Sequence, residues 1–407
     1  MSRRLILIVC AGILALGSVL AFRLLHDSPG PSESDERPAL PKRQEDLLPG
    51  NGVAPMGEKT EVPIVRLAFE AAQLVIQHPP RIRDRNKKIV YSIACPEGSP
   101  HGGTLVFSRW AEIKLPEQVP SSGKLAVVAR ADVFAYEPSS TGSIGMEWYL
   151  NFADEDLFVA YGSGLLAQDE LQVAEHPALG ALREALRAKH VECSTTERGH
   201  PTPVLIRGVE RRCAMALDPN AALGRPNGLY GQQFAKAGEA TVKQAVTALQ
   251  PPTTSHILAM AAPAGGSGPY KAEELEHILA TAYTGFRAAV LETKWARGEN
   301  ALQNGMDPKL EPFPDQPIVV IHTGFWGCGA FGGNRDLMAL LQLLAAQMAG
   351  VDRLVFHTFD QTGMQALERA RTLLADLTGS PGTSTPIQVM IGKIQAKNFK
   401  WGVSDGN

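Results

Sequence analysis

The side chains best suited to acid–base chemistry are two adjacent carboxylates, Asp169 and Glu170. They follow Gln168 and a turn of small residues at 162–164. Like charges held side by side raise the pKa of one member, so such a pair can keep a proton near neutral pH. The same pattern is also typical of a first helical turn, where carboxylates offset the helix dipole. Short motifs are often fortuitous, so residues 168–170 alone do not decide between these interpretations.

A second candidate site is the glycine-rich stretch 323–333, which reads T-G-F-W-G-C-G-A-F-G-G. A glycine loop before a helix points backbone N–H groups and the positive end of the helix dipole at one spot, which suits a phosphate or diphosphate. Three of its glycines also fit G-x-G-x-x-G, which is a weak signal by itself. The alternative is a tight turn that needs glycine for its backbone shape. Four bulky side chains among the glycines favour a loop that covers a ligand: Phe325, Trp326, Cys328 and Phe331.

The elements that flank this loop are the clearest in the chain. Consecutive apolar residues over 317–322 predict a buried strand. The spacing of leucines over 336–348 predicts an amphipathic helix, with Asn334 as its N-cap and Gly350 at its end. The loop therefore connects a strand to a helix.

The rest of the chain alternates between apolar strands and amphipathic helices. We expect strands within 124–134, 204–206, 256–260 and 354–359. We expect helices at 65–77, 178–189, 237–248, 272–286 and 364–377. This order predicts an α/β fold with a largely parallel or mixed sheet.

Length and composition set wide bounds on the class of protein. The chain has 407 residues, of which 44% are hydrophobic and 20% charged, with a net charge of -3. This length allows one large domain or two ordinary ones. The absence of a basic stripe argues against duplex nucleic acid as a partner. Five scattered cysteines without a C-x-x-C argue against a zinc site and against a disulfide framework, so we expect no metal.

The N-terminus predicts a membrane segment. Arg3 and Arg4 precede an apolar run over 5–22, which is just long enough to span a bilayer. We expect residues 1–26 to be a signal anchor, with a cleaved signal peptide as the alternative, and 27–62 to form a disordered linker. The positive-inside rule then places a globular domain, residues 63–407, outside the cytoplasm. That domain would be anchored to the membrane, or secreted if the segment is cleaved.

The two candidate sites together resemble one known family. Residues 323–333 and the helix after them are similar to the signature of the poly(ADP-ribose) glycohydrolase family, T-G-N-W-G-C-G-A-F-G-G followed by D and L-K-A-L-I-Q. Upstream, N-F-A-D at 151–154 is similar to the family's D-F-A-N, and 168–170 is similar to its Q-E-E, with no gap needed between the two blocks. Residues 282–286 and 358–360 resemble its A-Y-C-G-F and T-F-G-D.

The resemblance implies a macrodomain-like three-layer α/β/α sandwich with a mixed sheet and added helices, whose core covers about 124–377. It implies a hydrolase of ADP-ribose O-glycosidic bonds that needs no cofactor, with Glu170 as the general acid and Asp169 beside it. The loop at 323–333 would hold the diphosphate, and an aromatic ring would stack on the adenine. The substrate-binding residues that it implies are Asn151, Asp154, Gln168, Tyr230, Gly324, Gly327, Cys328, Gly329, Ala330, Phe331, Gly332, Gly333 and Phe359.

Departures from the family pattern leave two other functions open. Phe158, Val159 and Ala160 stand where the family has three glycines, and Asp169 replaces a glutamate. Side chains at 158–160 would keep a ribose away, because glycine permits the closest approach. One alternative is therefore a catalytically weak or inactive membrane-tethered module that binds ADP-ribose or a nucleotide. Another is a Rossmann dinucleotide enzyme with Asp360 as its ribose-binding acid.

Overall fold

A computed structural model describes residues 61–121, 124–136, 145–263, 265–303, 317–380 and 382–404. The strands are β1 (Pro63–Glu70), β2 (Thr104–Trp110), β3 (Gln118–Pro120), β4 (Ala126–Arg130), β5 (Met146–Ala153), β6 (Thr196–Glu197), β7 (His200–Pro201), β8 (Val204–Met215), β9 (Val246–Ala261), β10 (Val319–Thr323), β11 (Arg353–His357) and β12 (Ser384–Pro386). The helices are α1 (Ala71–Gln77), α2 (Arg85–Ala94), α3 (Gln168–Glu175), α4 (Ala178–Ala188), α5 (Gln233–Lys236), α6 (Glu239–Ala245), α7 (Ala272–Gln303), α8 (Arg335–Ala349), α9 (Gln361–Thr378) and α10 (Ile387–Gln395).

The membrane segment predicted at 1–26 lies outside the described residues, and so does almost all of the linker predicted at 27–62. Among the helices that are described, none combines the length and the apolar character needed to cross a bilayer. The four cysteines within the described residues, Cys95, Cys193, Cys213 and Cys328, are not joined by disulfides.

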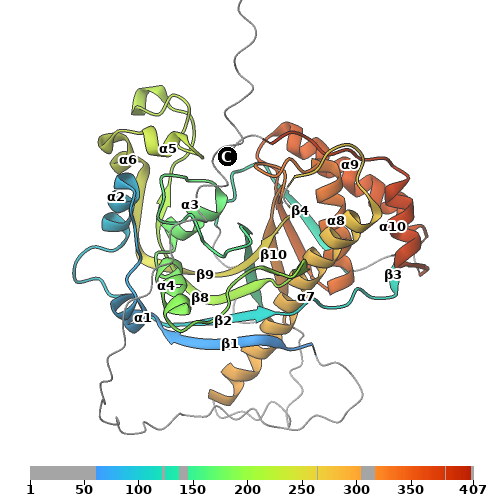
Figure 1. The fold of residues 1–407 in the computed structure, drawn as a ribbon, viewed down its shortest axis with the longest axis horizontal. Coiled ribbons are helices and arrows are strands. Elements are labelled where there is room, and N and C mark those ends of the chain that lie inside the picture. The colour runs from blue at the N-terminus through green and yellow to red at the C-terminus, as the bar shows by residue number, and fades with distance from the viewer. Residues whose placement is uncertain are drawn as a thin grey trace, which may run out of the picture. The chain divides into compact units, whose positions relative to one another are not determined.

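Eight strands form one mixed sheet in the order β1-β2-β8-β9-β5-β10-β11-β4 (Figure 1). From β9 to β4 neighbouring strands run parallel, whereas β1, β2 and β8 are joined by antiparallel pairing. The carboxyl ends of parallel strands meet at one edge of a sheet, so the loops after β4, β5, β9, β10 and β11 emerge together. The prediction of an α/β fold with a mixed sheet is confirmed.

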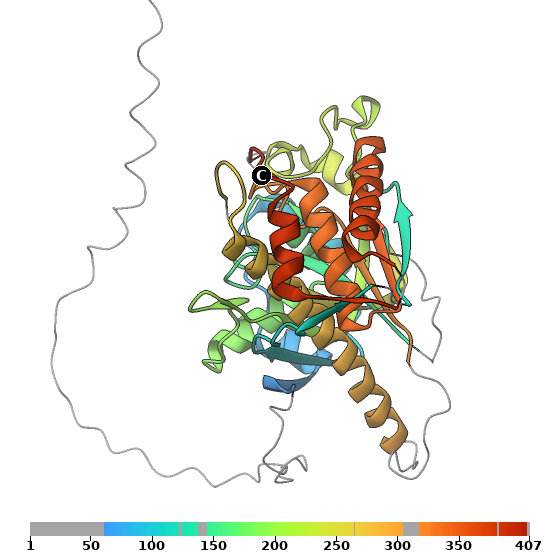
Figure 2. The same ribbon diagram turned by 90° about the vertical axis from the view of Figure 1, so that its right-hand side faces the viewer.

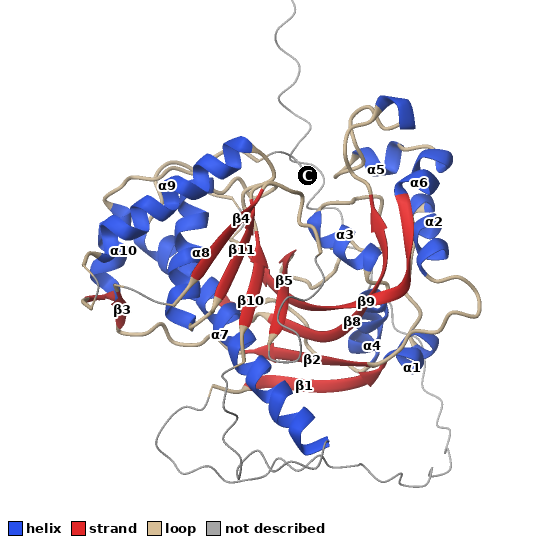
Figure 3. Cartoon of the chain, turned by 180° about the vertical axis from the view of Figure 1, so that it is seen from behind, coloured by secondary structure: helices blue, strands red, loops and turns tan. Residues whose placement is uncertain are grey.

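Helices cover both faces of this sheet, and α7 to α10 gather on one side of it (Figures 2 and 3). Along β5, Trp148 and Leu150 pack into a core shared with α7, α8, α9 and α10. The alternate residues Tyr149 and Ala153 pack on the opposite face, in a core shared with α1 and α4. This alternation is what a strand buried on both faces requires. The described residues thus form the three layers that the resemblance implies.

The helix predicted over 65–77 is wrong in its first half. Residues 63–70 form β1, which pairs antiparallel with β2, and only α1 is helical. The apolar side chains of β1 recur at every second residue, which is the period of a strand, and they pack on the second core: Val65, Leu67 and Phe69. Whether an edge segment of this kind forms a strand depends on the strand with which it pairs, and that strand, β2, is not among the predicted elements.

Most other predicted elements are present with shifted ends. The strand and helix around the glycine loop are β10 and α8, and Asn334 and Gly350 cap α8 as predicted. The helix expected over 237–248 ends at Ala245, because the chain there enters the long strand β9. The helix expected over 272–286 continues to Gln303 as α7.

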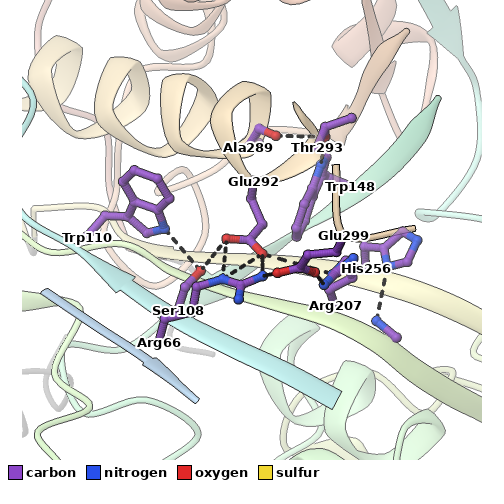
Figure 4. Close-up of polar contacts among 11 residues, drawn as sticks. Arg66, Ser108, Trp110, Trp148, Arg207, His256, Ala289, Glu292, Thr293 and Glu299 are labelled. Carbon is purple, nitrogen blue, oxygen red and sulfur yellow. Dashed lines mark hydrogen bonds and ion pairs between the residues drawn. The ribbon is translucent and has the colours of Figure 1, made fainter. Parts of the chain in front are cut away.

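A buried ion-pair network fixes α7 to the antiparallel half of the sheet (Figure 4). The buried Glu292 carboxylate accepts hydrogen bonds from Arg66 of β1 at 2.8 Å and from Ser108 of β2 at 3.3 Å. Arg66 also reaches Glu299 at 2.7 Å, and Glu299 pairs with Arg207 of β8. Two carboxylates and two guanidinium groups therefore neutralise one another between one helix and three strands, as buried charges must.

Candidate active site

A cavity of about 420 Å³ lies at the carboxyl edge of the parallel strands. Its walls come from the loops after β4, β5, β9, β10 and β11 and from the first turn of α3. The predicted site residues that line it are Asp154, Gln168, Asp169, Glu170, Tyr230, Gly324, Gly327, Cys328, Gly329, Ala330, Phe331 and Phe359. Asn151, Gly332 and Gly333 lie behind this wall.

Backbone shape explains part of the glycine content of the loop. Gly327 has a φ of 75°, and a Cβ at this position would lie 2.6 Å from the Cβ of Ala262. Gly333 packs beneath the same turn, donates to the Gly327 carbonyl at 2.8 Å, and leaves no room for a Cβ. These two positions need glycine whether or not a ligand binds.

Other residues of the loop offer an anion-binding surface. Gly329, Ala330 and Phe331 line the cavity, and their N–H groups donate to no acceptor within the described part of the chain. The loop leads into α8, where the Asn334 Oδ1 caps the helix by accepting from the Leu337 N–H at 3.1 Å. Free N–H groups beside a helix N-terminus form an arrangement that suits a phosphate group.

The first turn of α3 brings the two carboxylates to the same cavity. Asp169 and Glu170 are both buried. The Gln168 side chain ties this turn to β5, because its Oε1 accepts from the Phe152 N–H at 2.8 Å and its Nε2 donates to the Leu150 carbonyl at 2.9 Å. Gln168 therefore lines the cavity, but its amide acts as a clamp between helix and strand.

Asn151 and Tyr230 support this turn from two elements. Asn151 is fully buried in β5 and donates from Nδ2 to the Asp169 Oδ1 at 3.0 Å. The Tyr230 hydroxyl accepts from the Gln168 N–H at 3.1 Å, and the residue also lines the cavity. Both Asn151 and Tyr230 are predicted to touch the substrate. Tyr230 lines the cavity, whereas Asn151 does not line it and instead orients Asp169.

Burial raises the pKa of both carboxyl groups. The pKa of Asp169 rises to about 8, because the group is buried and lies beside the charge of Glu170. Burial also raises the pKa of Glu170, against the opposing effects of the Lys87 cation and of the Ala167 N–H, which donates to the Glu170 Oε2 at 3.0 Å. The pair therefore keeps a proton at neutral pH, as a general acid requires.

The side chains at 158–160 do not narrow the cavity. Phe158 is fully buried in the second core, and its φ of 58° is a left-handed backbone conformation that glycine adopts more freely. None of Phe158, Val159 and Ala160 is among the described residues that line the cavity. The obstruction expected from the sequence is therefore not found, because the loop keeps a glycine-like backbone and turns its ring into the core.

The cavity wall also holds a cation that is not among the predicted site residues. Among the described lining residues, Arg335 is the one with a permanent positive charge. Its guanidinium carbon lies 5.2 Å from the centre of the Phe325 ring, within the range of a cation–π contact. Arg335 is the first residue of α8, directly after the N-cap, and this position next to the glycine loop was a signal that could have identified it.

A buried polar chain also reaches the cavity and was not predicted. Asp132 and His357, which line the cavity after β4 and at the end of β11, are hydrogen-bonded at 2.5 Å. His357 is bonded to His322 of β10 at 3.1 Å, and His322 to Glu147 of β5 at 3.3 Å. Each residue lies on one of four neighbouring strands or just after it, so only the strand order brings them together.

The Rossmann alternative does not fit this structure. β11 lies between β10 and β4, and the sheet does not follow the doubly wound order 3-2-1-4-5-6. Asp360, which that reading assigns to ribose binding, caps α9 by accepting from the Gly363 N–H at 2.8 Å. It is not among the described residues that line the cavity.

The layered mixed sheet and its glycine loop define an α/β/α protein whose cavity, at the carboxyl edge of its parallel strands, has the backbone geometry that suits an anion. Residues 225–366 match the family described as poly(ADP-ribose) glycohydrolase, macro domain fold. Over this segment the chain is similar to that family, in agreement with the resemblance seen in the sequence. The segment contains Tyr230, the glycine loop and Phe359, whereas Asp169 and Glu170 precede it.

Individual relatives match more weakly. A curated relative, "Probable poly(ADP-ribose) glycohydrolase 2" of Arabidopsis thaliana, is 26% identical over 159 residues, which are 36% of this chain and 30% of that protein. The chain thus spans less than a third of the curated relative that it matches.

Two solved structures are similar over more of the chain. The poly(ADP-ribose) glycohydrolase of Thermomonospora curvata bound to the inhibitor ADP-HPD is 15% identical, over 74% of this chain and 87% of that one, with a TM-score of 0.35. That of Deinococcus radiodurans in complex with ADP-ribose is 13% identical, over 76% of this chain and 95% of that one, also with a TM-score of 0.35.

Proposed function

We propose that this chain binds ADP-ribose and hydrolyses ADP-ribosyl O-glycosidic bonds, with Glu170 as the general acid. One observation carries the proposal: the free amide groups of the glycine loop and the buried Asp169–Glu170 pair line the same cavity. An ADP-ribosyl group joins a diphosphate to a ribose that carries the leaving group, so it needs an anion site and an acid in one place. The family match over 225–366 and the name of the curated relative support the same chemistry.

The diphosphate would be held by the loop. The N–H groups of Gly329, Ala330 and Phe331 would donate to its oxygens, and the N-terminus of α8 would add a favourable dipole. Arg335 would offset the remaining negative charge, which matters because the cavity is also lined by four carboxylates. The Phe359 ring is 56% exposed and Tyr230 also lines the cavity, so either ring offers a face on which adenine can stack.

The acid would act on the glycosidic oxygen. Glu170, supplied with the proton that the Asp169–Glu170 pair holds, protonates the leaving oxygen while the bond to the anomeric carbon breaks, and the sugar passes through an oxocarbenium-like state. Water then adds to that carbon, and the proton it releases returns to the Glu170 carboxylate. Asp169, oriented by Asn151, would lie beside the reacting ribose.

Binding without turnover is the second candidate function. One contact favours it: the Glu170 Oε2 accepts from the Ala167 N–H, which stabilises the ionised carboxylate and so works against the acid form. Such a protein would bind ADP-ribose as tightly but would leave the glycosidic bond intact.

Two measurements separate hydrolysis from binding without turnover. Calorimetry measures ADP-ribose affinity, and a hydrolysis assay measures turnover of poly(ADP-ribose) and of an O-linked mono-ADP-ribosyl peptide. We expect Glu170→Gln to reduce turnover by at least about 100-fold, the usual contribution of a general acid, and to change ADP-ribose affinity by only about threefold or less. The exposed Glu117→Gln is the matched control and should change neither. Binding without hydrolysis in the unmodified protein would favour the second candidate, and no binding at all would reject both.

We also propose that residues 1–26 anchor the domain to a membrane, on its non-cytoplasmic side. The proposal is supported by Arg3 and Arg4 ahead of the apolar run at 5–22. Protease added to intact cells should then remove the domain. Full protection of the domain would contradict this placement.

A further inference from the structure

We infer that Lys87, a buried residue of α2, is a positioning residue for the Asp169–Glu170 pair and for the loop that leads into it. The inference rests on the proposed function, since it assigns these carboxylates to the reaction. Lys87 lies far before residues 225–366, the segment that matches the glycohydrolase family, and it does not line the cavity.

The Lys87 side chain lies between α2 and α3. Helix α2 contacts α3, and only 3% of Lys87 is exposed. Its Nζ donates to the Tyr161 carbonyl at 2.8 Å. Together with Val173 and Ala174 of α3, the Lys87 side chain lines a small void between the two helices. A lysine so deeply buried is rare unless its charge has partners.

The same stretch of chain holds the loop that ends in α3. The N–H groups of Arg83 and Asp84 donate to the Gly162 carbonyl at 3.0 and 3.1 Å. The Arg81 N–H donates to the Tyr161 hydroxyl at 2.6 Å. With the bond from Lys87, residues 81–87 fix both the backbone and the ring at the centre of the loop between Asp154 and Gln168.

The charge of Lys87 acts on the two carboxylates. Burial lowers the pKa of Lys87 to about 8, and the negative charges of Glu170, Asp169 and Asp84 oppose that effect, so the ammonium stays charged at neutral pH. In return, the cation opposes the rise in pKa that burial imposes on Asp169 and Glu170. If the pair holds one proton, its single negative charge balances Lys87, which is the arrangement that a buried site tolerates best.

Other titratable groups surround this cluster. Asp84 caps α2, and Asp154 follows β5 and raises the pKa of both carboxyl groups. The phenols of Tyr91 and Tyr161 line the same void as Lys87. At the far end of α3, Glu175 is paired with Arg211 of β8 at 2.8 Å. Among the described groups that shift the pKa values of the carboxylate pair, Lys87 is a cation, and its charge limits how far burial raises them.

Carboxyl NMR titration of the full chain, labelled with carbon-13 in its Asp and Glu side chains, tests this role. Lys87→Met removes the charge and keeps most of the side-chain length. We expect the titration midpoint of the pair, assigned with Glu170→Gln, to rise by about one pH unit or more. The alkaline limb of the pH–rate profile should move up with it, because the acid stays protonated to higher pH. An unchanged or lowered midpoint in folded Lys87→Met would overturn the inference.

Lys88→Met is the matched control, because this exposed neighbour on α2 carries the same charge. It should leave the midpoint unchanged, and an equal shift in this variant would also overturn the inference. Should Lys87→Met fail to fold, the reciprocal titration replaces it: in Glu170→Gln the Lys87 Cε signal should titrate at lower pH than in the unmodified protein, and no change there would reject the inference. These titrations need no turnover, so an absence of hydrolysis would reject the proposed function alone.

Discussion

At Asp169, the burial that suits acid–base chemistry works against stability at high pH. The folded protein keeps a proton on this group up to a pKa of about 8, whereas the ordinary value is 3.8. Between these two pH values the folded state binds more protons than the unfolded state, so the free energy of unfolding falls as pH rises. Stability that is fully present at low pH is therefore lost progressively towards pH 8.

Asp169→Asn should remove this dependence, because the amide does not titrate. Measured by urea denaturation between about pH 5 and about pH 8, the unmodified protein should lose up to about 1.4 kcal/mol per pH unit more than the variant. The exposed Glu239→Gln serves as the control and should keep the slope of the unmodified protein. Parallel slopes for Asp169→Asn and the unmodified protein would show that Asp169 is ionised in the folded state.

Arg335 is a second single residue with a role that can be tested, because it adds a positive charge beside the backbone N–H groups of the glycine loop. Arg335→Gln should weaken ADP-ribose binding about tenfold or more, the usual effect of losing a charge-assisted hydrogen bond, while adenosine affinity stays the same because adenosine has no phosphate. Calorimetry with both ligands measures the difference. Arg371→Gln, a change at an exposed arginine on α9 that does not line the cavity, should alter neither affinity. An equal loss for adenosine would mean that Arg335 supports the wall and not the diphosphate.

Among the elements, α7 depends on its charged contacts to an unusual degree. The buried Glu292 joins the helix to β1 and β2, and removing it leaves the half-buried Arg66 paired with Glu299. We expect Glu292→Ala to lower the free energy of unfolding by about 2–3 kcal/mol, because hydrogen bonds between charged groups are lost. Glu273→Ala, an exposed change in the first turn of the same helix, should cost less than about 1 kcal/mol. Urea denaturation measures the free energy of unfolding of both variants. Similar losses of this free energy in the two variants would contradict the role assigned to the network.

Elements with local signals could be predicted from the sequence, and elements decided by a partner could not. β10 and α8 were predictable because a β-branched run, an N-cap and a terminal glycine all lie in one short stretch. β1 was mistaken for helix because its alternation is short and its partner β2 was not recognised. α2 was missed because its first four residues are all polar, and it is held by distant contacts such as Lys87 with Tyr161.

At the scale of the whole molecule, the site divides in the same way. The glycine loop and the Asp169–Glu170 pair could be assigned because glycines before a helix suit a phosphate group and adjacent carboxylates suit acid–base chemistry. Asp132, His357 and Lys87 could not, because nothing near them in the sequence says what they face. The opposite error concerns Phe158, which was expected to obstruct the ribose and is instead buried in the core.

The pairing of β10 with β5 has a kinetic consequence. These neighbours in the sheet, which join Val319 to Met146, lie far apart in the sequence, and they carry the loops that form the two sides of the cavity. During synthesis, the loop after β5, with the Asp169–Glu170 pair, therefore leaves the ribosome long before the glycine loop after β10. A contact between strands so far apart in the sequence forms late, because ordering the intervening chain costs conformational entropy. The capacity to bind ADP-ribose should consequently appear only at the end of folding, and would report that the central sheet has been completed.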